Sequence, residues 1–333
     1  TLADALAPVL GQLDTLPVFD RQMLGYLVAM AEGVEGAPFN RIDVASWYPY
    51  EASGVNAMPI GGYKRLIEDA AQGLTIRRAT PVHSIHWGEE GVHAQTEHER
   101  FQADAVIITS PLSMFKTERL KIEPPLPPAW QEAIAAIGFG DGASLNKIYL
   151  RFEQQFWPDI DDRFVALPAS FETRGRFVTW SSLVDVVGAP VLLGFTSGAQ
   201  GAYLDLEASD EEILAAAMTS IRRVFGPDAP EPCAYRVTRW ISDPWACGSY
   251  SFSEPETTAA HRLRYAEPVS TRLYLAGEAA SPGHYGTVHA ALLAGQLAAF
   301  RLLRGLAGVE PDPSQLPWAP FLARHPQALT MMI

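Results

Sequence analysis

The chain has 333 residues, 48% of them hydrophobic and 19% charged, which is enough to bury a large core and favours two domains or one composite domain. With 25 Lys and Arg against 38 Asp and Glu, the net charge is −13, and because an acidic surface repels phosphate backbones we expect no nucleic-acid partner. No apolar run is long enough to span a bilayer, so no membrane span is expected. Cys233 and Cys247 show no metal-site or disulfide spacing, and we expect a reduced, cytoplasmic location.

The first third of the chain predicts helices followed by a close series of strands. Apolar residues within 1–36 recur at helical spacing and predict one or two helices, ended by Gly33 and Gly36. A short helix is expected at 63–71. Runs of apolar and β-branched residues predict strands at 74–77, 82–87, 92–96 and 105–109.

The remainder mixes strands and helices. Four prolines between 124 and 128 predict a rigid connection. Helices are expected at 129–137, 210–225 and 286–304, and strands at 146–152, 177–180, 191–196 and 272–276. The tail after Gly308 is expected to wrap the surface or to be loose.

One segment near the C-terminus combines a buried strand, a glycine turn and a helix. The strand at 272–276 runs into Gly277-Glu278, and the following helix begins near Gly286. The N–H groups at such a helix start favour negative charge. The small residues on one helix face allow a close approach to a sheet or to a flat ring. Periodicity alone favours a tightly packed α/β helix, so that interpretation stays open beside the ligand-binding one.

This segment resembles the C-terminal flavin signature of the amine oxidase family, which includes monoamine oxidases, polyamine oxidases and flavin-type histone lysine demethylases. The resemblance implies that the Gly-Glu pair approaches the ribityl and pyrophosphate part of FAD and that the helix start faces the flavin ring. The cofactor-binding residues implied are Gly277, Glu278, Gly286, Thr287, Val288 and Ala291. Thr287 is also implied at the substrate.

Three further segments resemble the same family in the same order. The segment from Gly62 to 85 implies that Val82 meets the adenine, and the segment at 105–112 implies that Thr109 and Pro111 lie near the cofactor. The segment at 138–152 resembles the strand that carries the family's flavin-facing lysine. This assigns Lys147 as the catalytic residue, which would hold a water near flavin N5. A lone strand lysine is otherwise most often a solvated charge.

The Trp-rich segment at 239–251 resembles the family loop beside the cofactor. It implies that Trp240, Trp245 and Ser249 bind FAD and that Tyr250 forms a wall of the substrate site. Ser249 stands where covalent-flavin members have a cysteine, so non-covalent FAD follows from the resemblance.

The resemblance implies an aromatic cage that is incomplete in this chain. Monoamine oxidases have a second tyrosine at the position of Thr287, and whether Tyr285 substitutes for it stays open. His284 and His289 are interpreted as hydrogen-bonded structural residues.

The implied fold is α/β, with an FAD-binding domain built from discontinuous segments, a substrate domain of mixed sheet and helices, and the N-terminal βαβ unit missing. Relatives carry a G-x-G-x-x-G loop ahead of these segments, and this sequence has none. A truncated record, a piece of a processed enzyme and a true loss of the unit all stay open. The expected division is 1–54 (helical part of the substrate domain), 55–120 (FAD-binding domain), 121–238 (substrate domain), 239–306 (FAD-binding domain) and 307–333 (tail).

The resemblance implies FAD-dependent oxidation of an amine. Hydride passes from the carbon beside the nitrogen to flavin N5, the imine hydrolyses, and O2 is reduced to hydrogen peroxide. The expected partners are a small-molecule amine and O2. A homo-oligomer and association with a missing N-terminal piece both stay open.

Two alternatives to amine oxidation remain. One is a related flavin oxidase or desaturase acting on an amino acid or secondary metabolite, and the other is a non-catalytic chain without FAD. A chromatin demethylase is disfavoured because the stretch near 124 holds no long heptad-patterned insertion.

Overall fold

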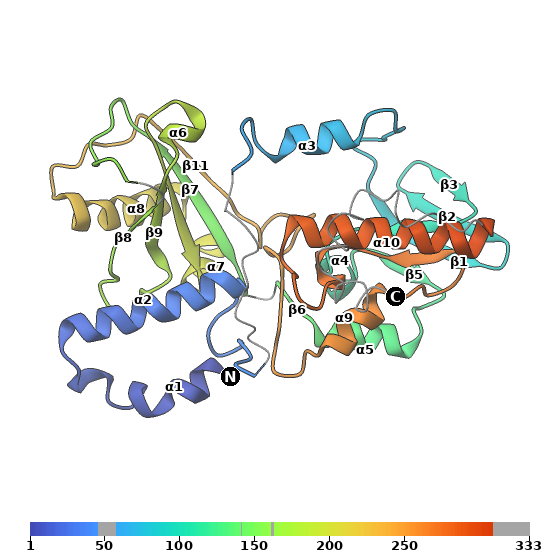
Figure 1. Cartoon of the computed structure of the whole chain (residues 1–333), viewed down its shortest axis with the longest axis horizontal. Helices are drawn as coiled ribbons and strands as arrows, with labels where there is room; N and C mark the ends of the chain where they lie inside the picture. The colour runs from blue at the N-terminus through green and yellow to red at the C-terminus, as the bar shows by residue number, and fades with distance from the viewer. Residues whose placement is uncertain (46–57, 141, 161–162, 309–333) are drawn as a thin grey trace, which may run out of the picture. The chain divides into compact units, whose positions relative to one another are not determined.

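The computed structural model describes residues 1–45, 58–140, 142–160 and 163–308, and the chain divides into two compact units (Figure 1). Unit 1 combines residues 1–79 with 141–244, and unit 2 combines 80–140 with 245–333. Each unit therefore draws on two separate stretches of the chain, and both mix helices with sheets. The prediction of an α/β fold assembled from discontinuous segments is confirmed.

Unit 1 is built on a five-stranded antiparallel sheet with the order β11-β7-β10-β9-β8. Its strands are β7 (Leu145–Arg151), β8 (Arg163–Val165), β9 (Arg176–Ser182), β10 (Val191–Ser197) and β11 (Ala234–Val237). Its helices are α1 (Leu2–Leu10), η1 (Leu13–Thr15), α2 (Val18–Glu35), α3 (Tyr63–Ala70), α6 (Val184–Val187), α7 (Gly198–Leu206) and α8 (Asp210–Phe225).

The core of unit 1 lies between this sheet and the helices α7 and α8. Along β7 the buried residues alternate with less buried ones, as a strand with one covered face requires. Ile148 and Leu150 are fully buried and belong to the same cluster as Trp180 of β9 and Ile221 of α8. On the opposite face, the Ser197 hydroxyl of β10 donates to a backbone carbonyl of α2 at 3.2 Å. The sheet therefore has helices on both faces.

Local sequence signals explain where the two longest helices of unit 1 begin and end. The α8 helix starts with a capping box, in which the Ser209 side chain accepts from Glu212 N and the Glu212 carboxylate accepts from Ser209 N. The α2 helix ends at Gly36, whose φ of +63° is the left-handed conformation that favours glycine. Gly33 lies inside α2, so the prediction that it ends the helix is wrong.

Unit 2 contains a four-stranded sheet with the order β3-β2-β1-β5 and two strand pairs, β13-β4 and β12-β6. Its strands are β1 (Val82–Gly88), β2 (Gly91–Thr96), β3 (Arg100–Ala103), β4 (Val106–Ile108), β5 (Lys121–Glu123), β6 (Gly138–Phe139), β12 (Ser251–Phe252) and β13 (Leu273–Leu275). Its helices are α4 (Ser113–Lys116), α5 (Pro128–Ala136), α9 (Ala259–Ala266), η2 (Glu278–Ala280) and α10 (Val288–Ala307).

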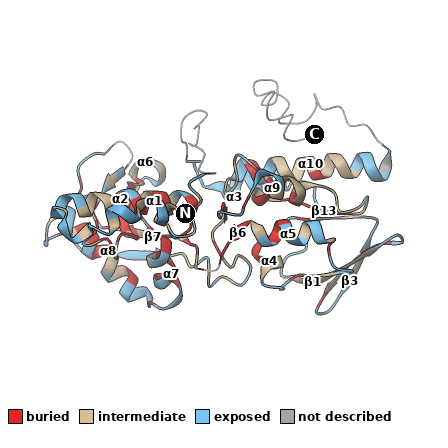
Figure 2. Ribbon diagram, turned by 90° about the horizontal axis from the view of Figure 1, so that it is seen from below, coloured by how far each residue is buried: buried red, intermediate tan, exposed pale blue. Residues whose placement is uncertain are grey.

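The long helix α10 packs on the β13-β4 pair at only part of its surface. Ala298 is buried against Tyr274 and Ala276, and Leu302 packs on the same cluster. The other residues of α10 are mostly intermediate or exposed (Figure 2). Ala290, in the first turn of α10, is also buried, while Val288, Ala291 and Leu292 are exposed. The small-residue face that was predicted to approach a sheet or a flat ring is therefore covered only in part within the described residues.

The domain boundaries of the structure differ from those expected. Residues 121–140 belong to unit 2, because β5 pairs with β1 in parallel and α5 packs against α9. The expected strand at 74–77 is absent from the described part of the chain, where Leu74 and Ile76 are 66% and 52% exposed. The expected boundary at 54/55 and most of the expected tail, 309–333, lie outside the described residues.

Candidate functional site

Several predicted site residues gather where the parallel strands β4 and β13 end. Leu275 lies opposite Ile108, and Ala276 N donates to Ile108 O at 2.9 Å. Thr109 and Gly277 therefore follow two adjacent strand ends at the same edge. Loops at the carboxyl ends of parallel strands are where α/β folds bind ligands.

The backbone at this edge is open to close approach by a ligand. Gly277 has a φ of +137°, and no heavy atom of the described residues lies within 4 Å of a Cβ built on it. A Cβ built on Gly283 in the following loop, or on Gly295 of α10, also has no heavy atom of the described residues within 4 Å beyond its chain neighbours and, for Gly295, the backbone of the helix itself. A side chain at these glycines would occupy space that a ligand could use.

The first turns of α10 present an exposed apolar surface beside this edge. Val288 is 53% and Leu292 is 57% exposed, and Ala291 between them is also exposed. The helix is capped by Thr287, whose hydroxyl accepts from Ala290 N at 3.2 Å and donates to His284 O at 2.6 Å. The positive end of the helix dipole therefore lies at a surface of small and apolar side chains.

Glu278 joins three parts of unit 2 through its carboxylate. One oxygen accepts from Ser251 N at 2.9 Å, and the other accepts from the Ser251 hydroxyl at 2.7 Å and from Gly286 N at 2.6 Å. Both oxygens are therefore engaged within the chain, and Glu278 fixes the turn at Gly286 relative to the segment that carries Tyr250. A Cβ on Gly286 would lie 3.1 Å from the Tyr250 ring.

Lys147 lies in unit 1, on the central part of β7 and opposite Phe195 of β10. Two residues earlier on the same face, the Leu145 side chain lies 3.8 Å from the Cβ position of Gly33 in α2. Burial lowers the pKa of the Lys147 ammonium below its ordinary value. Among the described residues, no side chain forms a hydrogen bond or ion pair with this ammonium.

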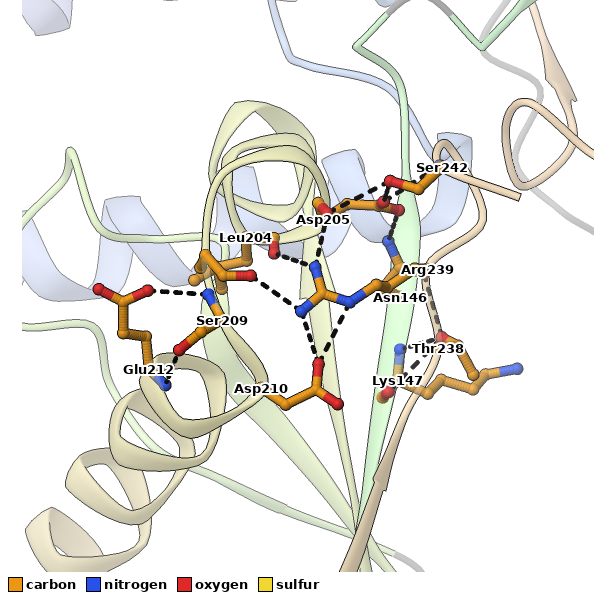
Figure 3. Close-up of polar contacts among 11 residues, drawn as sticks. Asn146, Lys147, Leu204, Asp205, Ser209, Asp210, Glu212, Thr238, Arg239 and Ser242 are labelled. Atoms are coloured by element: carbon orange, nitrogen blue, oxygen red, sulfur yellow. Dashed lines mark hydrogen bonds and ion pairs between the residues drawn. The ribbon is translucent and has the colours of Figure 1, made fainter. Parts of the chain in front are cut away.

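A buried polar cluster fixes the backbone around Lys147 (Figure 3). Asp205, which is 3% exposed, accepts from Asn146 Nδ2 at 2.7 Å, from Ile241 N at 2.9 Å and from the Ser242 hydroxyl at 2.6 Å. Asn146 Oδ1 in turn accepts from the Thr238 hydroxyl at 3.0 Å. The Lys147 side chain points away from this cluster (Figure 3). The cluster therefore holds the strand and leaves the ammonium free to act elsewhere.

The other predicted residues have different neighbourhoods. Trp240 belongs to unit 1, is 40% exposed, and its backbone N–H donates to Asn146 at 3.0 Å. Trp245 belongs to unit 2 and is 60% exposed. Val82 begins β1 and packs on the core of unit 2, and Pro111 is exposed just after Thr109.

Unit 2 brings most of the predicted residues together, and unit 1 holds two of them. Within unit 2, strand pairing and the Glu278 contacts connect one set: Thr109, Ser249, Tyr250, Gly277, Glu278, Gly286, Thr287, Val288 and Ala291. Lys147 and Trp240 belong to unit 1 and are joined by the Asn146 cluster.

Two residues that support these groups were not found from the sequence. Asp205 lies in α7, a helix that the sequence pattern did not predict, and Arg262 lies in α9, which was also missed. Both are nearly fully buried charged residues. The available signal was local: a polar Asn146 interrupts the apolar residues on the buried face of β7, so a buried polar partner was required.

Comparison with known proteins identifies the family. A family model described as "Flavin containing amine oxidoreductase" matches residues 20–303. Lysine-specific histone demethylase 1 homolog 2 of Arabidopsis thaliana is 33% identical over 291 residues, which is 85% of this chain and 38% of that protein. Polyamine oxidase 4 of Oryza sativa subsp. japonica is 36% identical over 282 residues, 84% of this chain and 56% of that protein.

Solved structures share the fold. A redesigned putrescine oxidase superposes with a TM-score of 0.62 at 22% identity, covering 74% of this chain and 53% of that one. Wild-type putrescine oxidase bound to putrescine gives a TM-score of 0.58 at 24% identity, covering 71% and 51%. The chain thus spans about two fifths to just over half of the length of these relatives.

The chain belongs to the flavin-containing amine oxidoreductase family. The residues present fit the cofactor of that family: there is unfilled space beside Gly277 and Gly295, and the apolar side chains of Val288 and Leu292 are exposed, so a flat ring could approach the backbone here. Among the described residues, no helix is long and apolar enough to cross a membrane, and no group of three or more His, Cys, Asp or Glu side chains could hold a metal ion.

Proposed function

We propose that the protein oxidises a small-molecule amine with non-covalently bound FAD and O2. The observation that supports this most strongly is the set of residues that follows β4 and β13, where the backbone at Gly277 is open, Glu278 fixes the turn at Gly286, and the start of α10 is exposed. Family membership and the likeness to a polyamine oxidase support the choice of an amine. The net charge of −13 also favours cationic ligands over anionic ones.

The residues of unit 2 would hold the flavin. Gly277 and the N-terminal end of α10 provide a close backbone approach and the positive end of a helix dipole, which stabilises negative charge on a reduced flavin. Bound there, the flavin would supply a two-electron acceptor for a hydride from the carbon beside the amine nitrogen, with O2 as the final oxidant. Ser249, in place of a cysteine, provides no thiol for a covalent link.

Lys147 and Tyr250 would carry the remaining roles. An ammonium whose pKa is lowered by burial, and which no described carboxylate neutralises, is suited to hold and orient a water molecule. We infer that Lys147 holds the water that assists reoxidation of the flavin or hydrolysis of the imine. Tyr250 would provide an apolar wall that tolerates a nearby positive charge, and Thr287 would lie at the substrate.

The full-length protein provides the test. We expect a flavin absorption spectrum, release of the flavin on acid precipitation, and peroxide formation with alkyl amines or polyamines. Lys147→Met should slow turnover or flavin reoxidation while the spectrum of the bound flavin stays intact. Lys121→Met, on the exposed strand β5, is the matched control and should behave as the unsubstituted protein.

Other outcomes would select the alternatives. Peroxide formation only with amino acids would point to an amino-acid oxidase of the same family. A protein that binds no flavin would leave a non-catalytic chain. Unchanged rates in Lys147→Met would remove Lys147 from the mechanism.

A further inference from the structure

Arg262 is a buried cation that contacts three separate segments of unit 2. Its side chain is on α9 and is 1% exposed. Its Nη1 donates to the Ser251 hydroxyl at 2.9 Å and to Ala279 O at 3.1 Å. Its guanidinium carbon lies 3.8 Å from the centroid of the Tyr285 ring. Burying a charge is costly unless it is compensated, so these contacts offset part of the cost of burying Arg262 in the folded state.

The Ser251 hydroxyl links Arg262 to Glu278 by two hydrogen bonds whose donors and acceptors can be arranged in only one way. A guanidinium can only donate a hydrogen bond and an ionised carboxylate can only accept one. Ser251 Oγ therefore accepts from Arg262 and donates to Glu278, at 2.9 and 2.7 Å. The same carboxylate oxygen accepts from Gly286 N. The chain Arg262–Ser251–Glu278–Gly286 therefore fixes two loops relative to each other.

Each of these two loops carries a tyrosine immediately before the fixed residue. Tyr250 precedes Ser251, and Tyr285 precedes Gly286. A Cβ on Gly286 would lie only 3.1 Å from the Tyr250 ring, so the loops approach each other closely at this glycine. Arg262 stacks on one face of Tyr285, a contact that restricts the movement of the ring. A ring held in place in this way loses little conformational entropy when a ligand packs on it.

We propose that Arg262 is a positioning residue for amine binding, because it holds Tyr285 as a second aromatic wall beside Tyr250. The inference rests on the proposed function. Thr287 offers no ring for such a wall, and Tyr285, two residues earlier in the same turn, does. Since a guanidinium already stacks on one face of Tyr285, the opposite face is a weaker site for a second cation. The wall therefore contacts the alkyl chain of the amine more than its charge.

The test is a double-mutant cycle in the full-length protein, with steady-state kinetics on the best alkyl amine or polyamine. Tyr285→Leu and Arg262→Met should each raise KM about 5-fold, the size of an aromatic contact of about 1 kcal/mol, with kcat changed less than about 2-fold. The double variant should show no more than the larger single effect, because both changes remove the same contact. Tyr285→Phe keeps the ring and should retain the original KM.

Arg264→Met is the matched control for Arg262→Met. Arg264 is on the same helix and also stacks on a ring, that of Trp130 at 5.0 Å, but it contacts Glu267 instead of Ser251. Its substitution should leave KM unchanged. If Arg262→Met does not fold, Arg262→Lys and Ser251→Ala replace it in the cycle, and both should raise KM.

The outcomes separate this inference from the proposed function. An unchanged KM in Tyr285→Leu, or effects of Tyr285→Leu and Arg262→Met that multiply in the double variant, would overturn the positioning role. An unsubstituted protein that binds flavin and oxidises amines keeps the proposed function whatever these variants do. A protein that does neither overturns the proposed function itself, and with it the role of Arg262.

Discussion

Replacing Asp205 by alanine should destabilise unit 1 strongly. The buried carboxylate accepts four hydrogen bonds, from Asn146 Nδ2, Ile241 N, Ser242 N and the Ser242 hydroxyl, at 2.7, 2.9, 3.1 and 2.6 Å. Alanine removes both carboxylate oxygens at once, while the backbone carbonyl of residue 205 still accepts from the Ser242 hydroxyl at 3.3 Å. The Asn146 amide keeps the Ser144 hydroxyl as a partner at 2.6 Å, but the backbone donors of 241 and 242 lose theirs.

The magnitude follows from the groups left without partners. A donor left unsatisfied in a buried position costs about 1–3 kcal/mol, and breaking a buried charged network costs about 3–5 kcal/mol. Because residues 241 and 242 are only partly buried, water will replace some of the lost bonds, and we expect a loss near the lower end, about 3 kcal/mol. Asp205→Asn keeps one oxygen and should lose less, about 2 kcal/mol.

Denaturant unfolding followed by tryptophan fluorescence measures the loss. The transition midpoint of Asp205→Ala should fall while the slope with denaturant stays constant. Asp228→Ala, at an exposed turn, is the control and should stay within about 0.5 kcal/mol of the unsubstituted protein. A loss below about 1 kcal/mol in Asp205→Ala would refute the idea that this cluster holds the strand of Lys147 in place.

Three further predictions test other parts of the structure. Gly198→Ala should lower the free energy of unfolding by about 2–4 kcal/mol, because φ is +57° and the new Cβ would lie 2.5 Å from the buried Glu32 carboxyl; a thermal melt that is unchanged would contradict the placement. Glu278→Gln should lower the free energy of unfolding by about 1–3 kcal/mol, because its NH2 group would face the hydrogen-bond donors of Ser251 or Gly286. Retention of flavin on dialysis should also fall. Full retention would show that the turn does not depend on the carboxylate. Burial lowers the pKa of Lys147. Below that lowered pKa the buried ammonium destabilises the folded state, and this destabilisation disappears as pH rises toward the ordinary lysine pKa of about 10.4. Lys147→Met should therefore be more stable than the unsubstituted protein near neutral pH, and the difference in free energy of unfolding should shrink as pH rises. Denaturant titrations at several pH values measure this difference, and a difference that does not change with pH would contradict the prediction.

Strongly periodic segments were predictable from the sequence. The helix α8 was expected at the observed residues, because its helical pattern starts on acidic residues that suit the helix dipole, and the structure adds the Ser209 cap. The strands β9 and β10 were found within one or two residues of their observed ends, since each is a short run of apolar and β-branched residues.

Elements that depend on tertiary partners were not predictable. The strand β5 has only three residues and is fixed by its parallel pairing with β1, about 37 residues earlier in the chain. The helix α7 begins at a glycine with positive φ and shows no clear period. At 74–77 apolar and β-branched residues suggested a strand. A strand forms only where a neighbouring strand supplies hydrogen-bond partners, and the described residues supply none there.

The candidate site was predictable only where its residues are continuous in sequence. Gly277, Glu278 and the helix start are continuous in sequence, so motif and structure coincide. The residues that hold the site are not continuous with it: Asp205 reaches Asn146 across 59 positions, and Arg262 reaches Ser251 and Ala279 across 11 and 17. Such contacts follow from packing, which a single sequence does not display.

Anaerobic titration of the purified full-length protein with an alkyl amine or polyamine, followed in the visible spectrum, tests the central claim most directly. The account predicts a flavin spectrum that bleaches on addition of the amine, recovers when O2 is admitted, and leaves the protein colourless after acid precipitation. A flavin that no amine bleaches would contradict amine oxidation, and a protein that takes up no FAD would contradict the site at Gly277 and the start of α10.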